Sequence, residues 1–250
     1  MATQLQQQPN DELGSVLNVG SDGLVHVSQE LSPGYFEENP FDNPAIKKAF
    51  DTAKALRNDF TNHHERRIHR NPKHTLAQHC DDMKKDLKAL DDRTVQRLTG
   101  AYNELQREIK STLAGLDDDA NLYANKDYIN AVTGAFYGLT PAKKAEAITK
   151  LIEDGEGSDL AILINSSQML TGLSKAERET IRRRAHEKAN SNAVRLLDQL
   201  QDAARRWDAG GNGAIRTIQK LGEGLGRFDA EIAKAEAMNV TRKPTAGFVE

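Results

Sequence analysis

Apolar residues recur at steps of three and four along most of the chain after residue 43. This spacing predicts amphipathic α-helices, because positions i, i+3 and i+4 share one helix face. The first helix is expected from Pro44, with Asn43 as its N-cap, to about residue 70. It ends before Asn71-Pro72 because proline disfavours helical geometry in the residue ahead of it. Its apolar stripe comprises Ile46, Ala49, Phe50, Ala53, Leu56 and Phe60.

A second, longer helix is expected over residues 76–113. Its steps of four, three, four and three from Leu76 to Leu90 are typical of coiled coils. About 40 residues of helix span roughly 60 Å, so we predict a long antiparallel helical hairpin over residues 44–116. Its stripe comprises Leu76, Cys80, Met83, Leu87, Leu90, Thr94, Leu98, Tyr102, Leu105, Ile109 and Leu113.

The third part, residues 117–238, is predicted to be a helical bundle. It contains an aromatic helix within 120–139, a short buried helix within 158–170 and a long helix over 175–208. Ser174 and Glu177 form a capping box ahead of the long helix. The glycine-rich residues 209–213 are expected to break that helix before a last, heptad-like helix. The expected stripes are Ile181, Ala185, Ala189, Leu196, Leu200, Ala203 and Trp207, then Ile215, Ile218, Leu221, Leu225, Phe228, Ile232 and Ala235.

The two ends of the chain lack this helical pattern. Residues 1–43 are expected to form a largely extended arm, and residues 239–250 a polar tail. Within the arm, two apolar runs flank a Gly-Ser-Asp-Gly turn, which predicts a β-hairpin over 15–28. Because an isolated hairpin is marginal in water, it must dock on the helical body, join another sheet or stay mobile. The fold class is therefore all-α, with an N-terminal arm.

Composition and charge narrow the classes of protein. The chain is 38% apolar and 28% charged, which suits long amphipathic helices. A single cysteine excludes an intramolecular disulfide framework. No run of about 18 apolar residues predicts a membrane span, and the first residues lack a secretory signal; we expect a cytoplasmic or virion-associated protein. Residues 1–46 carry seven carboxylates and no lysine or arginine, which leaves a formal charge of +4 on the remainder of the chain.

Candidate reactive groups do not converge in the sequence. Residues 63–80 hold five of the seven histidines and the only cysteine. Their spacing does not supply the paired Cys/His ligands of a zinc site, so no metal or cofactor is expected. Neighbouring carboxylates on a helix point apart and make poor acid/base partners. No nucleophile-elbow or phosphate-loop pattern occurs. We therefore expect a protein that is not an enzyme, and identify no small-molecule substrate.

Nucleic-acid contact remains as an alternative. Two basic clusters could touch phosphates, but no aromatic platform interleaves with them. The isoelectric point near 6.2 is also low for a dedicated nucleic-acid binder. The residues concerned are Arg66, Arg67, Arg70, Lys73, Arg182, Arg183 and Arg184.

Interaction with proteins is the function that the pattern favours. The heptad-like stripes exceed what a small core needs, so they predict oligomerisation or docking onto other proteins of an assembly. The expected oligomer seam comprises Leu87, Leu90, Leu98, Leu105, Ile109, Leu225, Phe228 and Ile232. The expected partner-binding residues of the arm are Val16, Val19, Leu24, Val27, Tyr35, Phe36 and Phe41.

The texture of the chain resembles that of helical accessory and internal proteins of tailed-bacteriophage particles. The resemblance lies in the start "MATQLQQQPN", the acidic arm to Asp42, and the Ala/Gln/Lys/Glu-rich helices at 76–113 and 175–208. The same texture is similar to that of helical proteins secreted by type III export systems. That resemblance implies an export signal and a chaperone-binding stretch in residues 1–45. Neither resemblance implies catalytic residues.

Overall fold

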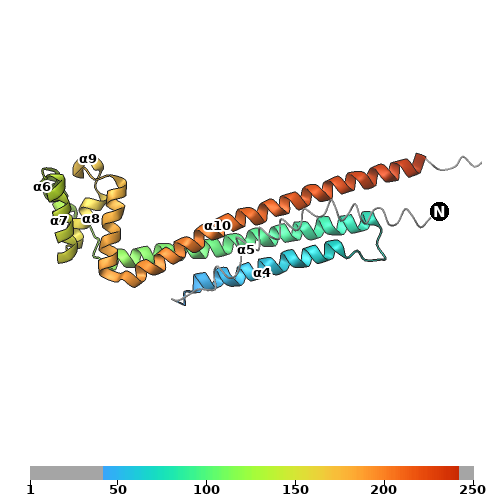
Figure 1. The fold of residues 1–250 in the computed structure, drawn as a ribbon, viewed down its shortest axis with the longest axis horizontal. Helices are drawn as coiled ribbons and strands as arrows, with labels where there is room; N and C mark the ends of the chain where they lie inside the picture. Colours follow the sequence, from blue (N-terminus) through green and yellow to red (C-terminus); the bar gives the residue numbers. More distant parts are fainter. Residues whose placement is uncertain (1–41, 242–250) are drawn as a thin grey trace, which may run out of the picture. The chain divides into compact units, whose positions relative to one another are not determined.

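A computed structural model describes residues 42–241 and divides them into two compact units (Figure 1). Unit 1 consists of residues 42–104 and 203–241, and unit 2 of residues 105–202. The predicted hairpin, the seven predicted partner-binding residues of the arm, and all but the first three residues of the predicted tail lie outside the described residues.

Every regular element in the described residues is helical, which confirms the all-α prediction for this part of the chain. No described helix combines the length and the apolar character that crossing a membrane requires. In chain order the elements are α4 (Pro44–Ile68), α5 (Leu76–Asp119), η1 (Lys126–Tyr128), α6 (Ile129–Tyr137), α7 (Pro141–Asp154), α8 (Gly157–Asn165), α9 (Gln168–Thr171) and α10 (Lys175–Thr241).

Side chains at the helix starts satisfy backbone groups that the helices leave free. The Asn43 carboxamide oxygen accepts hydrogen bonds from the backbone N–H of Ala45 and Ile46, which confirms the predicted N-cap. Glu177 and Ser174 form the predicted capping box: Glu177 accepts from the Ser174 backbone N–H at 2.7 Å, and its own N–H donates to the Ser174 hydroxyl at 3.2 Å. These local signals set the helix starts.

Unit 1 packs α4, the first part of α5 and the last part of α10 side by side (Figure 1). The predicted stripe of α4 forms the core, since all of its members except the partly buried Phe50 are buried. The predicted stripe of α5 is wrong at Tyr102, which is 37% exposed. The neighbouring Ala101 is buried in its place. From α10 the core receives Ala203, Ala204, Trp207, Ala214, Ile218, Leu221 and Leu225.

The predicted helix break at residues 209–213 is also wrong. α10 runs through this stretch with helical backbone, and Gly210 and Gly211 are buried. A Cβ atom added to Gly211 would lie 3.4 Å from Leu98 Cδ2 on α5. This distance is an ordinary van der Waals contact, so the Leu98 side chain packs directly against Gly211. Tertiary packing of α10 on α5 compensates for the low helix propensity of glycine, about 1 kcal/mol for each residue.

Unit 2 gathers the end of α5, the short helices α6–α9 and the start of α10 around its own core. The predicted short buried helix at 158–170 is confirmed over α8, whose residues from Leu160 to Ile164 are all buried. It is wrong after Asn165, where α8 ends and Met169 and Leu170 lie exposed on α9. α6 packs on α8 and α9, and α7 packs on α8. A Cβ atom at Gly157 would fall 2.1 Å from the carbonyl oxygen of Ala120, so only glycine fits where α8 begins.

Within unit 2, α10 changes direction at Asn190, the one residue inside it with non-helical backbone angles (φ −153°, ψ 83°) (Figure 1). The Asn190 side-chain oxygen accepts from the backbone N–H of Ala193 at 3.1 Å, as an N-cap does. Its amide donates to Asp119 Oδ2 at 2.8 Å. The predicted single helix over 175–208 is therefore two helices, and Ala189 at the junction is exposed rather than buried.

These units differ from the predicted division at residue 116. The predicted hairpin of α4 and α5 is completed by residues 203–241, which the sequence placed in a separate bundle. Unit 1 is thus built from two distant parts of the chain, and α5 and α10 each contribute to both units.

Candidate functional site

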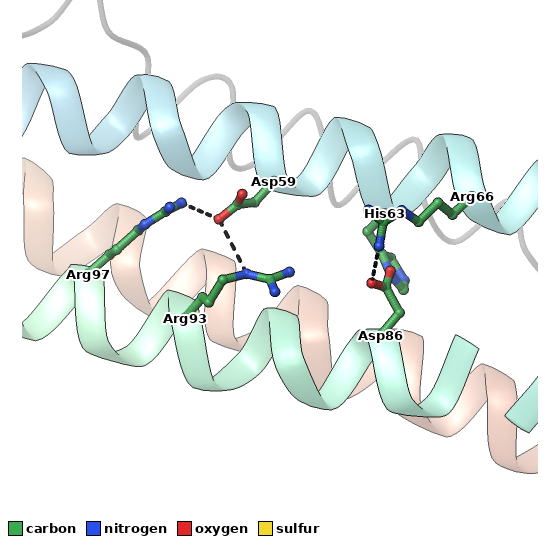
Figure 2. A network of polar contacts seen from close by, with 6 residues as sticks. All are labelled: Asp59, His63, Arg66, Asp86, Arg93 and Arg97. Carbon is green, nitrogen blue, oxygen red and sulfur yellow. Dashed lines mark hydrogen bonds and ion pairs between the residues drawn. The ribbon is translucent and has the colours of Figure 1, made fainter. Parts of the chain in front are cut away.

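A network of polar contacts in unit 1 links α4 to α5 (Figure 2). Asp86 on α5 accepts hydrogen bonds from His63 Nδ1 and from Arg66 Nη1, each at 2.7 Å. One heptad away, Asp59 on α4 binds Arg97 and lies 3.8 Å from the Nε atom of Arg93. Each acid thus receives two groups that are three or four residues apart on one helix face.

Burial determines the charge state of the histidine in this cluster. The His63 side chain is 3% exposed, and this burial lowers its pKa. Asp86 opposes the shift, whereas Arg67 and Arg66 add to it. Neutral His63 therefore donates its Nδ1 proton to Asp86. Its Nε2 atom is buried without a hydrogen-bond partner among the described residues.

This geometry does not suit a catalytic dyad. A histidine that acts as a general base must reach a substrate with its second nitrogen, and Nε2 of His63 is enclosed by side chains of the same unit. The contacts instead tie specific positions of α4 to specific positions of α5. Sequence reasoning missed this cluster, although Asp59, Asp86 and Arg93 each stand directly before a member of an apolar stripe.

The other histidines of the 63–80 cluster do not converge with His63. His74 contacts Asp82 at 2.9 Å, and buried His79 lies 3.3 Å from the carbonyl oxygen of Arg67. Burial raises the pKa of the Cys80 thiol, which disfavours the thiolate that metals bind. Within residues 42–241, no three His, Cys, Asp or Glu side chains gather closely enough to hold a metal ion.

The basic residues predicted for nucleic-acid contact are dispersed and partly neutralised. Arg67 is buried, and burial lowers its pKa. Arg66 binds Asp86, while Arg183 binds Asp198 through two hydrogen bonds of 2.7 and 2.9 Å and Glu187 through one of 2.8 Å. Arg70 and Lys73 are exposed, Arg182 donates to the Asn165 side chain, and Arg184 donates to the Thr149 hydroxyl. These contacts leave fewer free cations than the sequence suggests.

The predicted oligomer seam is mostly covered by the chain itself. Leu87, Leu90, Leu98, Leu105, Ile109 and Leu225 are each at most 9% exposed, and Phe228 and Ile232 are half-buried. Their apolar area is therefore already removed from water in a single copy. Oligomerisation through the six buried positions would require the helices to separate, so the seam as an interface stays a prediction.

A groove with a volume of about 470 Å³ lies between α7 and the start of α10 in unit 2. Ile148, Leu173 and Ile181 are buried beneath it. Exposed Ala145 on α7 and Ala176 on α10 line the groove, and their short side chains leave it shallow. The volume falls within the usual range for ligand and peptide pockets, about 300–1,000 Å³.

Large apolar side chains are also exposed in unit 2, on elements that pack on one another. Tyr128, Tyr137 and Met169 are 59%, 62% and 88% exposed. They lie on η1, α6 and α9, and α6 contacts both of the other elements. Tyr123 and Leu170 are also exposed, so five of the eight large apolar side chains that are exposed among the described residues belong to unit 2. We call Tyr123, Tyr128, Tyr137, Met169 and Leu170 the aromatic surface.

The sequence analysis assigned no role to these residues. A usable signal was present, because the stretch 120–139 carries three of the five tyrosines. Helical periodicity alone could not say which of them face the core.

Comparison with known proteins identifies no relative. No family model matches the chain, and no curated protein or solved structure is significantly similar to it.

Proposed function

We propose that this chain is a non-enzymatic assembly protein that associates with further copies of itself through the aromatic surface of unit 2. The observation that carries the proposal is the exposure of Tyr128, Tyr137 and Met169 on packed neighbouring elements. Tyrosine and methionine are enriched at protein interfaces, and clustered exposed apolar residues mark interaction sites more reliably than scattered ones.

The polar contacts of unit 1 support the same proposal. The contacts around Asp59 and Asp86 tie α4 to α5, and the His63 imidazole among them is buried. Unit 1 then serves as a rigid element, and knobs-into-holes coiled-coil packing of its long helices is part of the proposal. An internal accessory role in a tailed-bacteriophage particle, which the texture of the sequence suggests, is one setting for such a protein.

The test is the mass of the full chain in solution as a function of concentration, measured by sedimentation velocity. We expect species above 27.6 kDa whose population rises with concentration. A Tyr128→Ser, Met169→Ser double variant should shift the equilibrium towards the monomer, because it removes exposed apolar area without touching the core. The matched control is Val95→Ser, Tyr102→Ser, which alters two exposed apolar residues of unit 1.

A monomer at all concentrations would refute self-association. An assembly that the control variant weakens as much as the Tyr128→Ser, Met169→Ser variant would assign the interface to another surface.

A further inference from the structure

The groove of unit 2 has the form of a two-helix face that lacks a third partner. α7 contributes Pro141, Ala145 and Ile148, and α10 contributes Ala176 and Thr180. These residues recur at steps of three or four, so each helix turns one continuous face towards the groove. The exposed alanines leave room for bulky side chains from another segment. An apolar groove between two helices commonly accepts an amphipathic segment.

Two cations line the groove, and each donates its hydrogen bond to an uncharged oxygen. Lys144 donates to the carbonyl oxygen of Thr171 at 2.8 Å, and its ammonium lies over the rings of Phe136 and Tyr137. Arg184 donates to the Thr149 hydroxyl at 3.2 Å. These acceptors are neutral, and neither cation forms an ion pair with a carboxylate of the described residues.

The single carboxylate that lines the groove is already engaged. Glu177 accepts hydrogen bonds from both the backbone N–H and the hydroxyl of Ser174, each at 2.7 Å. These bonds lower the pKa of Glu177, which stays charged as a helix cap. The Lys144 ammonium also lowers the pKa of Glu177, so Lys144, Arg184 and Glu177 together leave a charge of +1 on the groove. An occupant with apolar side chains and carboxylates would match the apolar base and this remaining positive charge.

The chain itself contains a segment with this chemistry. Residues 11–42 carry seven carboxylates and no lysine or arginine. Among them stand Val16, Val19, Leu24, Val27, Tyr35, Phe36 and Phe41, which supply bulky apolar side chains. We propose that this acidic segment docks in the groove between α7 and α10 of its own chain.

The experiment detects the docked segment in the full chain by paramagnetic broadening. A nitroxide label is attached to Gln29→Cys, a polar position of the acidic segment. Cys80 is buried and reacts poorly, and the chain without the new cysteine, treated identically, measures any labelling there. We expect loss of intensity in the methyl resonances of Ala145 and Ala176. The loss should shrink at an ionic strength of about 1 M, where the Debye length is only about 3 Å.

Two variants separate docking from accidental proximity. Arg184→Glu should restore the methyl intensities, whereas Lys150→Glu, the same charge change at an exposed α7 position outside the groove, should not. Ala176→Trp should also restore the remaining groove intensities, because it fills the groove from an exposed position and leaves the charges unchanged. Circular dichroism checks that each variant remains folded.

Three results would overturn the proposal. The labelled chain could show no broadening at the groove, which then lies open or takes another partner. Broadening could survive both Arg184→Glu and Ala176→Trp. Broadening could also arise only between labelled and unlabelled chains in a mixed sample, which would make a second copy the occupant. Because the Tyr128→Ser, Met169→Ser variant leaves the groove intact, self-association and groove docking can fail independently.

Discussion

The indole N–H of Trp207 on α10 donates a hydrogen bond to the backbone carbonyl oxygen of Leu98 on α5, with a distance of 3.0 Å between nitrogen and oxygen. Trp207 is 1% exposed, and the Leu98 side chain also lies against Gly211, one turn further along α10. The only tryptophan of the chain and a glycine therefore meet α5 at one place. This contact fixes where the last part of α10 packs in unit 1.

We expect Trp207→Phe to lower the free energy of unfolding by roughly 2 kcal/mol. The change removes one buried hydrogen bond, worth about 1 kcal/mol, and leaves a cavity. Urea denaturation followed by circular dichroism measures the effect. Tyr102→Phe, at an exposed position of the same unit, is the control and should change stability by less than about 0.5 kcal/mol. Equal effects of the two substitutions would argue against the Trp207 contact.

Gly211 and Gly226 should respond in opposite directions to the same substitution. Gly211→Leu is expected to destabilise the protein by about 1–3 kcal/mol, because Leu98 already contacts a Cβ at this buried position and the further atoms of leucine overpack it. Gly226→Leu should stabilise it by up to about 1 kcal/mol, because nothing lies within 4 Å of an added Cβ and leucine favours the helix. Thermal or urea unfolding distinguishes the two. A stabilising Gly211→Leu would contradict the close approach of α10 to α5.

Asn190→Ala should destabilise unit 2 by about 1 kcal/mol or more, since it removes the cap to Ala193 and the hydrogen bond to Asp119. Asn190→Ser should recover part of the loss, because serine also caps helices. The neighbouring Asn192→Ala is the matched control. Hydrogen exchange of the amides after residue 190 provides a local measurement, and unchanged protection in Asn190→Ala would speak against a cap at this position.

Acid should weaken unit 1 through His63. Burial lowers the pKa of His63 in the folded state, so the unfolded chain takes up the proton first as the pH falls below about 6.5. The free energy of unfolding therefore decreases below that pH and levels off below the folded-state pKa. Urea titrations between about pH 7 and 5 measure this dependence. His63→Asn should flatten it, whereas exposed His69→Asn should not; identical slopes would place the effect elsewhere.

Duplex DNA should bind weakly and with little dependence on salt. The slope of log affinity against log salt is about −0.9 for each phosphate neutralised, and Arg66, Arg67 and Arg183 are occupied by burial or by carboxylates. Fluorescence anisotropy with a labelled duplex at several salt concentrations gives this slope. A steep slope that Arg70→Ala with Lys73→Ala reduces would restore the nucleic-acid alternative.

The sequence by itself determined the helical character of residues 44–241, two of the caps and most of the residues that face a core. Asn43, Ser174 and the stripe from Ile46 to Phe60 could be predicted because capping and periodicity act over a few residues. The run Asn-Ser-Asn at 190–192 also contains residues that favour an N-cap. The continuous apolar periodicity around it predicted a single helix instead. The helical conformation of Gly210 and Gly211 could not be predicted, because glycine weakens an isolated helix and only tertiary packing compensates for this.

Only the tertiary structure decided which faces the chain covers with its own residues. Leu98 and Leu225 have the spacing of an interface, yet α4, α5 and the end of α10 bury them within one chain. The aromatic surface combines residues as far apart in sequence as Tyr123 and Leu170. The groove combines residues as far apart as Leu139 and Arg184. Periodicity identifies an apolar face but carries no information on its partner, because hydrophobic burial is non-directional.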